Sequence, residues 1–303
     1  MINLKSELAQ EFWEKGKLDD CPIIDFHAHM GENGGIFLPK KTPEAMLSTM
    51  ESCNTLLTCF CSHEALFMPS IGTEMDIAVV KKYPDKFKAY HGVISNYADP
   101  ESDLKRVEEN PDVFVGFKFL CDYYSTPLSD PKHDKYWEYA DDNYLLVLCH
   151  TWRSNYDGYE EAEKVLRKYH NLIFIAGHSF HDDWDKAIEL VKKYPNIYLE
   201  LTAVLDDRGP LDMFVREIGS ERILFGTDLP WFSTHHGIGA VLSAEMTDED
   251  RRNIFYRNGV RLLSRFSWFK DKGTVLDRGT VPMSHNVSRK AYELELLFFN
   301  INI

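Results

Sequence analysis

The chain has 303 residues, of which 44% are hydrophobic and 27% are charged, and its formal net charge is -14 at pH 7. This hydrophobic content excludes an intrinsically disordered protein. The negative charge disfavours binding to nucleic acids or to anionic membrane surfaces, because both are polyanions. We therefore expect a globular protein whose partner is a small molecule.

The amino-terminal segment, residues 1–20, is polar and charged and lacks the apolar core of a secretion signal. No later stretch is apolar over the length of a membrane-spanning helix. These features predict a cytoplasmic protein. The six cysteines are scattered, without the paired spacing of a zinc ribbon or the density of a disulfide scaffold, so we expect free, buried thiols.

Eight apolar runs of strand length recur at intervals close to the length of one strand-plus-helix unit. Their near-continuous apolar character is typical of parallel strands that are covered on both faces. The predicted strands are residues 23–30, 55–62, 87–95, 113–120, 144–151, 172–179, 197–203 and 222–229.

Amphipathic stretches between these runs have apolar residues at the three- and four-residue spacing of helices, at residues 43–52, 73–83, 134–143, 158–169, 183–194 and 211–218. The alternation predicts an α/β fold with a parallel sheet, and eight units favour closure into a (β/α)8 TIM barrel. We expect a single domain over residues 1–303. It would comprise a short amino-terminal helix, a core at about 22–264 and a carboxyl-terminal extension at 265–303. The apolar run at 294–303 could pack on the barrel or on another subunit.

Polar side chains gather at the carboxyl ends of the predicted strands, where barrels of this kind place reactive groups. His27 and His29 end the first strand and point the same way, because alternate side chains of a strand share a face. Four further candidates end later strands: Lys118, His150, His178 and Asp228. No Gly-x-Gly-x-x-Gly follows the first strand, which argues against a dinucleotide cofactor.

Neutral imidazoles and a carboxylate suit a divalent metal ion, with zinc favoured and manganese or iron as alternatives. His27, His29 and Asp228 would hold such an ion and leave positions open for water and substrate. The ion would lower the pKa of bound water and so supply a nucleophile. Asp228 could then accept the water proton and pass it to the leaving group.

The chain resembles the amidohydrolase superfamily of metal-dependent barrels, in the amidohydrolase-related branch that includes aromatic-acid decarboxylases. The resemblance runs from about Pro22 to Ser264, and its carriers are His27, His29, His150, His178 and Asp228, in that order along the strands. Residues 247–263, which begin with Thr247-Asp248-Glu249-Asp250, also resemble the helix that closes these barrels.

Lys118 has two interpretations. In the two-metal members of the superfamily a lysine on the fourth strand carries a bridging carbamate. This resemblance implies one ion on His27, His29, Lys118 and Asp228, and a second on Lys118, His150 and His178. In the alternative there is one ion, His178 is a general acid or base, and Lys118 is a cation for a substrate carboxylate. We favour one ion, because the resemblance implies that single-metal members are common in this branch and that a plain lysine in a Gly-x-Lys context, here Gly116-Phe117-Lys118, recurs there without a carbamate.

Trp152 and Arg153 directly follow His150. An aromatic wall beside a guanidinium would suit a cyclic substrate with a carboxylate, so we predict that both residues bind substrate. A rim aromatic beside a solvent-exposed arginine is the alternative.

Our functional hypothesis is a metal-dependent hydrolase of an amide, ester or lactone, with catalytic roles for Asp228 and His178. The first alternative is non-oxidative decarboxylation of an unsaturated or aromatic acid, and the second is a catalytically silent binding barrel. The substrate itself and any homo-oligomeric state are left open by the sequence.

Overall fold

The computed structural model describes residues 5–269, and the chain divides into two compact units, Met1–Leu263 and Ser264–Ile303. The first unit contains all the elements named below. The predicted apolar run at 294–303 lies outside the described residues, and the single-domain organisation stays a prediction.

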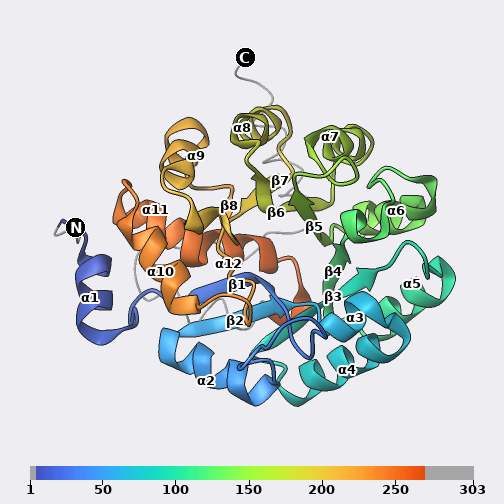
Figure 1. Ribbon diagram of the computed structural model, residues 1–303, viewed down its shortest axis with the longest axis horizontal. Helices are drawn as coiled ribbons and strands as arrows, with labels where there is room; N and C mark the ends of the chain where they lie inside the picture. Colours follow the sequence, from blue (N-terminus) through green and yellow to red (C-terminus); the bar gives the residue numbers. More distant parts are fainter. Residues whose placement is uncertain (1–4, 270–303) are drawn as a thin grey trace. The chain divides into compact units, whose positions relative to one another are not determined.

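The first unit is a TIM barrel in which eight parallel strands form the inner ring and helices surround them (Figure 1). The strands pair in chain order, and the ring closes where Ala28 bridges Leu229 and the backbone N–H of Phe26 donates to the carbonyl of Phe225. The strands are β1 (Ile23–Ala28), β2 (Thr55–Phe60), β3 (Phe87–Val93), β4 (Phe114–Phe119), β5 (Leu146–Trp152), β6 (Ile173–His181), β7 (Ile197–Glu200) and β8 (Ile223–Leu224).

All eight predicted strands are present, because their apolar residues pack inward against the barrel core and outward against the helices. Every residue of β1, β3 and β4 is buried, as expected for parallel strands covered on both faces. The largest difference is β8, which spans two residues where eight were predicted. The remainder of that segment turns at Asp228, whose φ is 55°, and this turn brings its side chain to the barrel mouth.

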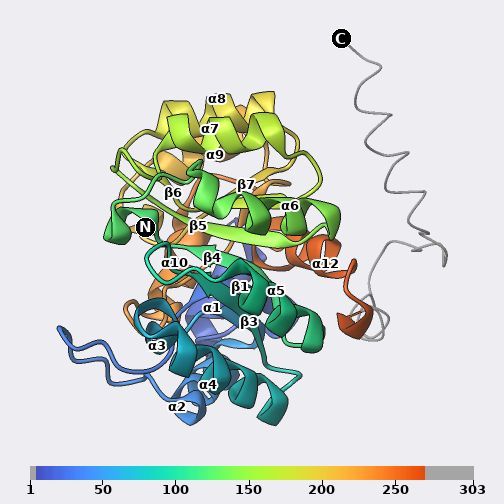
Figure 2. The same ribbon diagram turned by 90° about the vertical axis from the view of Figure 1, so that its right-hand side faces the viewer.

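The outer layer is seen from the side in Figure 2. Its helices, with the amino-terminal helix first, are α1 (Glu7–Lys15), α2 (Pro43–Cys53), α3 (His63–Phe67), α4 (Pro69–Lys82), α5 (Pro100–Glu109), α6 (Asp134–Asp142), α7 (Tyr159–Lys168), α8 (Trp184–Lys193), α9 (Pro210–Ile218), α10 (Thr234–Ser243), α11 (Asp248–Arg252) and α12 (Asn258–Leu263). The six helices predicted between strands are present, whereas α3, α5 and α10 were not predicted. In α5 only Val107 is buried, so its sequence has almost no apolar face to detect.

The predicted closing helix begins at Thr247, which forms a capping box with Asp250. It continues as α11, a π-helical turn η4 (Asn253–Arg257) and α12. The buried side chain of Asn258 links this helix to the barrel. Its Nδ2 donates to the carbonyls of Ser220 (2.7 Å) and Ile223 (2.8 Å), at the start of β8.

Replacing Asn258 with alanine should lower the free energy of unfolding by about 2–4 kcal/mol, because two carbonyls of the β8 segment lose their buried donor. Urea unfolding would measure this loss. Asn143→Ala, which removes an exposed amide bonded to Tyr139, is the matched control and should change stability by less than about 0.5 kcal/mol. Equal effects of the two substitutions would contradict the proposed link.

Asp76 on α4 is a buried carboxyl group that accepts a hydrogen bond from the backbone N–H of Ser62 (3.2 Å). Burial raises the pKa of Asp76 to about 8. In the unfolded chain the same group titrates at about 4. Between these values the folded protein holds a proton that the unfolded chain releases. The stability that this proton provides is therefore complete below about pH 4 and is lost as the pH rises through 8.

Asp76→Asn cannot ionise, so the variant should lose less stability than the wild type between about pH 5 and pH 8. The difference should be about 1.4 kcal/mol per pH unit at most. Urea unfolding of both proteins across this range is the measurement. Parallel pH profiles would show that Asp76 is ionised in the folded protein.

The six cysteines are buried free thiols, as expected. Within residues 5–269, no helix combines the length and the apolar composition that crossing a membrane requires. The cytoplasmic location stays a prediction.

Candidate metal centre

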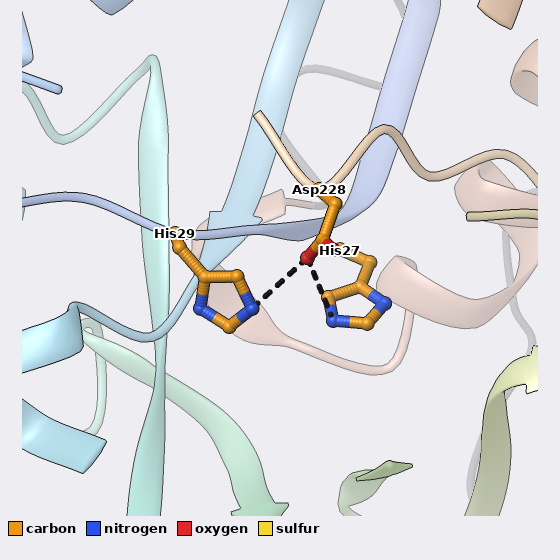
Figure 3. Close-up of side chains that lie close together, drawn as sticks. All are labelled: His27, His29 and Asp228. Atoms are coloured by element: carbon orange, nitrogen blue, oxygen red, sulfur yellow. Dashed lines mark ion pairs between the residues drawn. The ribbon is translucent and has the colours of Figure 1, made fainter. Parts of the chain in front are cut away.

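The side chains of His27, His29 and Asp228 meet at the carboxyl end of the barrel (Figure 3). His27 lies on β1, His29 follows that strand, and Asp228 follows β8. Oδ1 of Asp228 lies 3.0 Å from Nε2 of His29 and 3.4 Å from Nε2 of His27. The three candidate ligand atoms lie within 4.8 Å of one another, so one ion could contact all three.

The second nitrogen of each imidazole is fixed by a hydrogen bond to a residue on or just after another strand. Nδ1 of His29 donates to the carbonyl of Cys61 (2.8 Å), and a carbonyl can only accept. Nδ1 of His27 donates to the carboxylate of Glu200 (2.7 Å). In the neutral rings both Nε2 atoms therefore carry lone pairs directed at Asp228, the arrangement that metal-ligating histidines show.

The charges of this group match a cation site. Burial alone would raise the pKa of Asp228, but positive charge on the rings of His27 and His29 would outweigh it and hold the pKa well below its usual range, so the carboxylate form goes with positive charge at this position. Burial lowers the pKa of His27 well below its ordinary value. Oδ1 of Asp228 is buried without a hydrogen-bond partner. A carboxylate oxygen facing two imidazole lone pairs requires a cation or a proton, so these residues fit a divalent metal ion.

Lys118 lies on β4, beside the triangle formed by His27, His29 and Asp228. Its amine is buried, and Nζ lies 2.8 Å from Nε2 of His27. Burial lowers the pKa of Lys118. The structure thus brings Lys118 to the centre of the barrel mouth, where either a cation for substrate or a bridging carbamate would be placed.

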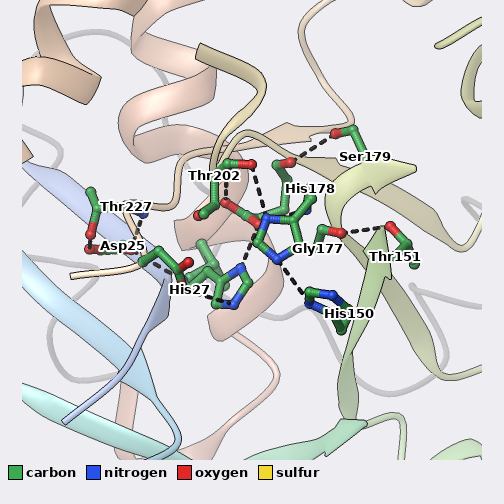
Figure 4. Close-up of polar contacts among 12 residues, drawn as sticks. Asp25, His27, His150, Thr151, Gly177, His178, Ser179, Thr202 and Thr227 are labelled. Atoms are coloured by element: carbon green, nitrogen blue, oxygen red, sulfur yellow. Dashed lines mark hydrogen bonds and ion pairs between the residues drawn. The ribbon is translucent and has the colours of Figure 1, made fainter. Parts of the chain in front are cut away.

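His150 and His178 form a second histidine pair, which lies next to His27 (Figure 4). Nδ1 of His178 donates to the carbonyl of Thr202 (3.2 Å), so its Nε2 accepts from Nδ1 of His150 (3.1 Å). Burial lowers the pKa of His178 to about 3, which keeps the imidazole neutral. The rings of His178 and His27 lie 5.0 Å apart between centroids, so all six predicted metal-site residues belong to one connected group.

Glu200, the last residue of β7, was not predicted as a site residue. It is fully buried, and besides His27 it accepts the backbone N–H groups of Thr202 (2.6 Å) and His178 (3.3 Å). Its carboxylate thus contacts one member of each histidine pair, His27 and His178. The available signal was a lone acidic residue ending an apolar strand, at the end of the barrel where the other site residues lie.

Trp152 and Arg153 lie in different environments. The indole of Trp152 contacts His178 edge-on, with ring centroids 5.1 Å apart, and stacks on His181 at 3.9 Å. Arg153 is 61% exposed and pairs with Asp182. Trp152 therefore borders the site as the aromatic wall requires, whereas the guanidinium of Arg153 is engaged at the rim. Their roles in substrate binding stay predictions.

Residues 72–265 match the sequence model of a family described as amidohydrolase. The match spans more than half of the chain and contains Lys118, His150, His178 and Asp228, whereas His27 and His29 precede it. The chain belongs to this amidohydrolase family, which confirms the resemblance seen in the sequence. A search of curated proteins found no match.

Solved structures share the fold across nearly their whole length. An uncharacterized TIM-barrel protein from Bordetella bronchiseptica is 19% identical, with a TM-score of 0.67 over 80% of this chain and 99% of that one. The 2,6-dihydroxybenzoate decarboxylase from Rhizobium is 15% identical, with a TM-score of 0.66 over 80% and 99%. The 5-carboxyvanillate decarboxylase from Novosphingobium aromaticivorans, in complex with manganese, is 12% identical, with a TM-score of 0.65 over 81% and 97%. At these identities the similarity establishes the fold.

Proposed function

We propose that the protein is a metal-dependent, non-oxidative decarboxylase of an aromatic or unsaturated carboxylic acid. The observation that carries the proposal is the buried amine of Lys118 beside the acceptor triangle of His27, His29 and Asp228. A decarboxylase must hold a carboxylate in the barrel mouth, and a second cationic group at the metal site would serve that purpose. Two of the structurally similar proteins described above are decarboxylases of substituted benzoates.

The proposed reaction breaks the bond between the substrate's α-carbon and its carboxyl carbon, releases carbon dioxide and adds a proton to the remaining carbon. A divalent ion on His27, His29 and Asp228 would supply positive charge for the carboxylate and a neighbouring oxygen. Lys118 would orient the carboxylate by a charge-assisted hydrogen bond. The carbon that loses carbon dioxide would then face the pair formed by His150 and His178.

The proton would come from this pair. His150 directs its Nδ1 hydrogen at Nε2 of His178, and Nδ1 of His178 is fixed by the Thr202 carbonyl. Because Nδ1 of His150 is held by Nε2 of His178, the proton given to the substrate carbon would leave from Nε2 of His150, and this ring would have to be protonated when the substrate binds. Tyr123 contacts His150 edge-on at 5.7 Å and Trp152 stacks on the same ring at 6.5 Å, and this aromatic surrounding favours a flat substrate.

Incubating the purified protein with Mn²⁺ or Zn²⁺ and a panel of hydroxybenzoates tests the proposal. The expected result is carbon dioxide release with the decarboxylated product, dependent on added metal. Conversion of amide, ester or lactone substrates to a new acid without carbon dioxide would instead support hydrolysis. Metal-loaded protein that is inactive on both panels would favour the binding barrel.

Hydrolysis is the second candidate, because Lys118, His150 and His178 are also the residues that a bridging carbamate and a second ion would use in the two-metal scheme. In that case metal analysis should find two ions per chain, and bicarbonate should raise the occupancy.

A further inference from the structure

His63 lies at the first position of α3, directly behind His29. Its backbone N–H donates to the carbonyl of Met30 (2.8 Å), and the side chain of Ser62 caps the helix through the N–H of Ala65 (3.0 Å). These contacts fix the backbone of His63 against the loop that follows β1. The side chain is buried, although sequence analysis did not include it among the site residues.

The ring of His63 has three contacts. It stacks on the imidazole of His29, with centroids 5.2 Å apart and an interplanar angle of 24°. Its Nδ1 donates to the carbonyl of Gly31 (3.2 Å), and its Nε2 accepts the indole N–H of Trp231 (2.8 Å). A carbonyl can only accept and an indole nitrogen can only donate, so both nitrogens are assigned and a single neutral tautomer satisfies both partners.

Trp231 follows Asp228 by three residues, and its backbone N–H donates to the Asp228 carbonyl (2.7 Å). The hydrogen bond between Trp231 and His63 therefore joins the segment after β8, which carries Asp228, to the ring that supports His29. The start of α3 and the segment after β8, which are 168 residues apart at these two positions, are thus joined beside the triangle of His27, His29 and Asp228.

We propose that His63 and Trp231 are positioning residues for the metal centre, and this rests on the proposed function. The stack restrains the plane of the His29 ring, and the indole hydrogen bond restrains the turn that presents Asp228. Together they hold the two ligand atoms at a separation that one ion can bridge, before the ion binds. Groups that orient metal ligands typically contribute 10–100-fold in metal affinity.

Three variants separate the contacts. Trp231→Phe keeps an aromatic ring and removes the donor, whereas His63→Phe keeps the stack and removes both hydrogen bonds. His63→Gln places an amide oxygen near the position of Nε2, where it can accept the indole hydrogen. We expect Trp231→Phe and His63→Phe each to weaken Mn²⁺ binding about tenfold or more. The double variant should bind Mn²⁺ as tightly as the single variant with the lower affinity, because both substitutions remove the same hydrogen bond. His63→Gln keeps an acceptor for the indole but removes the stack, so it should also bind Mn²⁺ less tightly than the wild type.

The readout is the Mn²⁺ dissociation constant of metal-free protein, measured by equilibrium dialysis. The melting temperature of each metal-free variant reports any loss of the fold, and Trp13→Phe, at a 73% exposed position on α1, is the matched control. Variants that bind Mn²⁺ like the wild type would overturn the positioning role of His63 and Trp231 and leave the proposed function untouched. Purely additive losses in the double variant would also overturn this role, because both single substitutions remove the same indole hydrogen bond. A wild type that binds no Mn²⁺ or Zn²⁺ would overturn the proposed function as well.

Discussion

Replacing His29 with alanine is expected to weaken divalent metal binding by more than about 100-fold while leaving the barrel folded. The imidazole provides one of three converging donors, and losing a direct ligand should cost more than losing a group that only orients one. The barrel core, rather than the ion, stabilises the fold, so the far-UV circular dichroism should be unchanged. Metal analysis after dialysis measures the loss.

The matched control is His170→Ala, which removes an exposed histidine between α7 and β6, at the amino-terminal end of the barrel. It should keep the metal affinity of the wild type. Added Mn²⁺ or Zn²⁺ should raise the melting temperature of the wild type and of His170→Ala but not of His29→Ala, because only proteins that bind the ion in the folded state are stabilised by it. Full occupancy in His29→Ala would refute the ligand assignment.

Lys118→Met is expected to lower kcat/KM by about 10²–10³-fold, because the substrate carboxylate loses a buried cationic partner. Methionine has a similar length and no charge, so the core should accept it without loss of stability. If Lys118 acts as a cation, the number of metal ions per chain stays the same as in the wild type. Metal analysis together with steady-state kinetics on any substrate found in the panel measures both quantities.

A fall in metal content in Lys118→Met would support the bridging carbamate and the two-ion scheme. Lys88→Met is the control, because Lys88 is also a buried barrel lysine, but it lies at the start of β3 and contacts the carbonyl of Asp112. It should retain both metal and activity. Equal losses in the two variants would mean that the effect arises from barrel packing.

The architecture was readable from the sequence because each strand is apolar over its whole length and each unit repeats this pattern. The same regularity located the predicted ligands, since the carboxyl ends of parallel strands meet at one mouth. The residues His27, His29 and Asp228 could be grouped without coordinates for that reason. Helix α5 could not be predicted, because a charged surface helix that buries only Val107 lacks the apolar periodicity on which recognition depends.

The partners of the ligands were decided by the tertiary structure alone. Glu200 reaches His27 across the barrel, and Trp231 reaches His63 across the mouth, over separations of more than 150 residues. Nothing in the local sequence of either pair encodes the distance between them. Arg153 follows a predicted ligand strand, yet its guanidinium pairs with Asp182 at the rim, because side-chain direction in a loop depends on neighbouring loops.

The sequence by itself thus determined the barrel and the residue types at its carboxyl end. The apolar pattern of each strand is local, and in a closed parallel sheet the residues that end the strands lie at the same end of the barrel. Only the tertiary structure decided which nitrogen of His27, His29 and His178 is held by the carboxylate or carbonyl that orients the ring. Those features depend on hydrogen bonds between distant strands, and a hydrogen bond requires distances and angles that residue order does not specify.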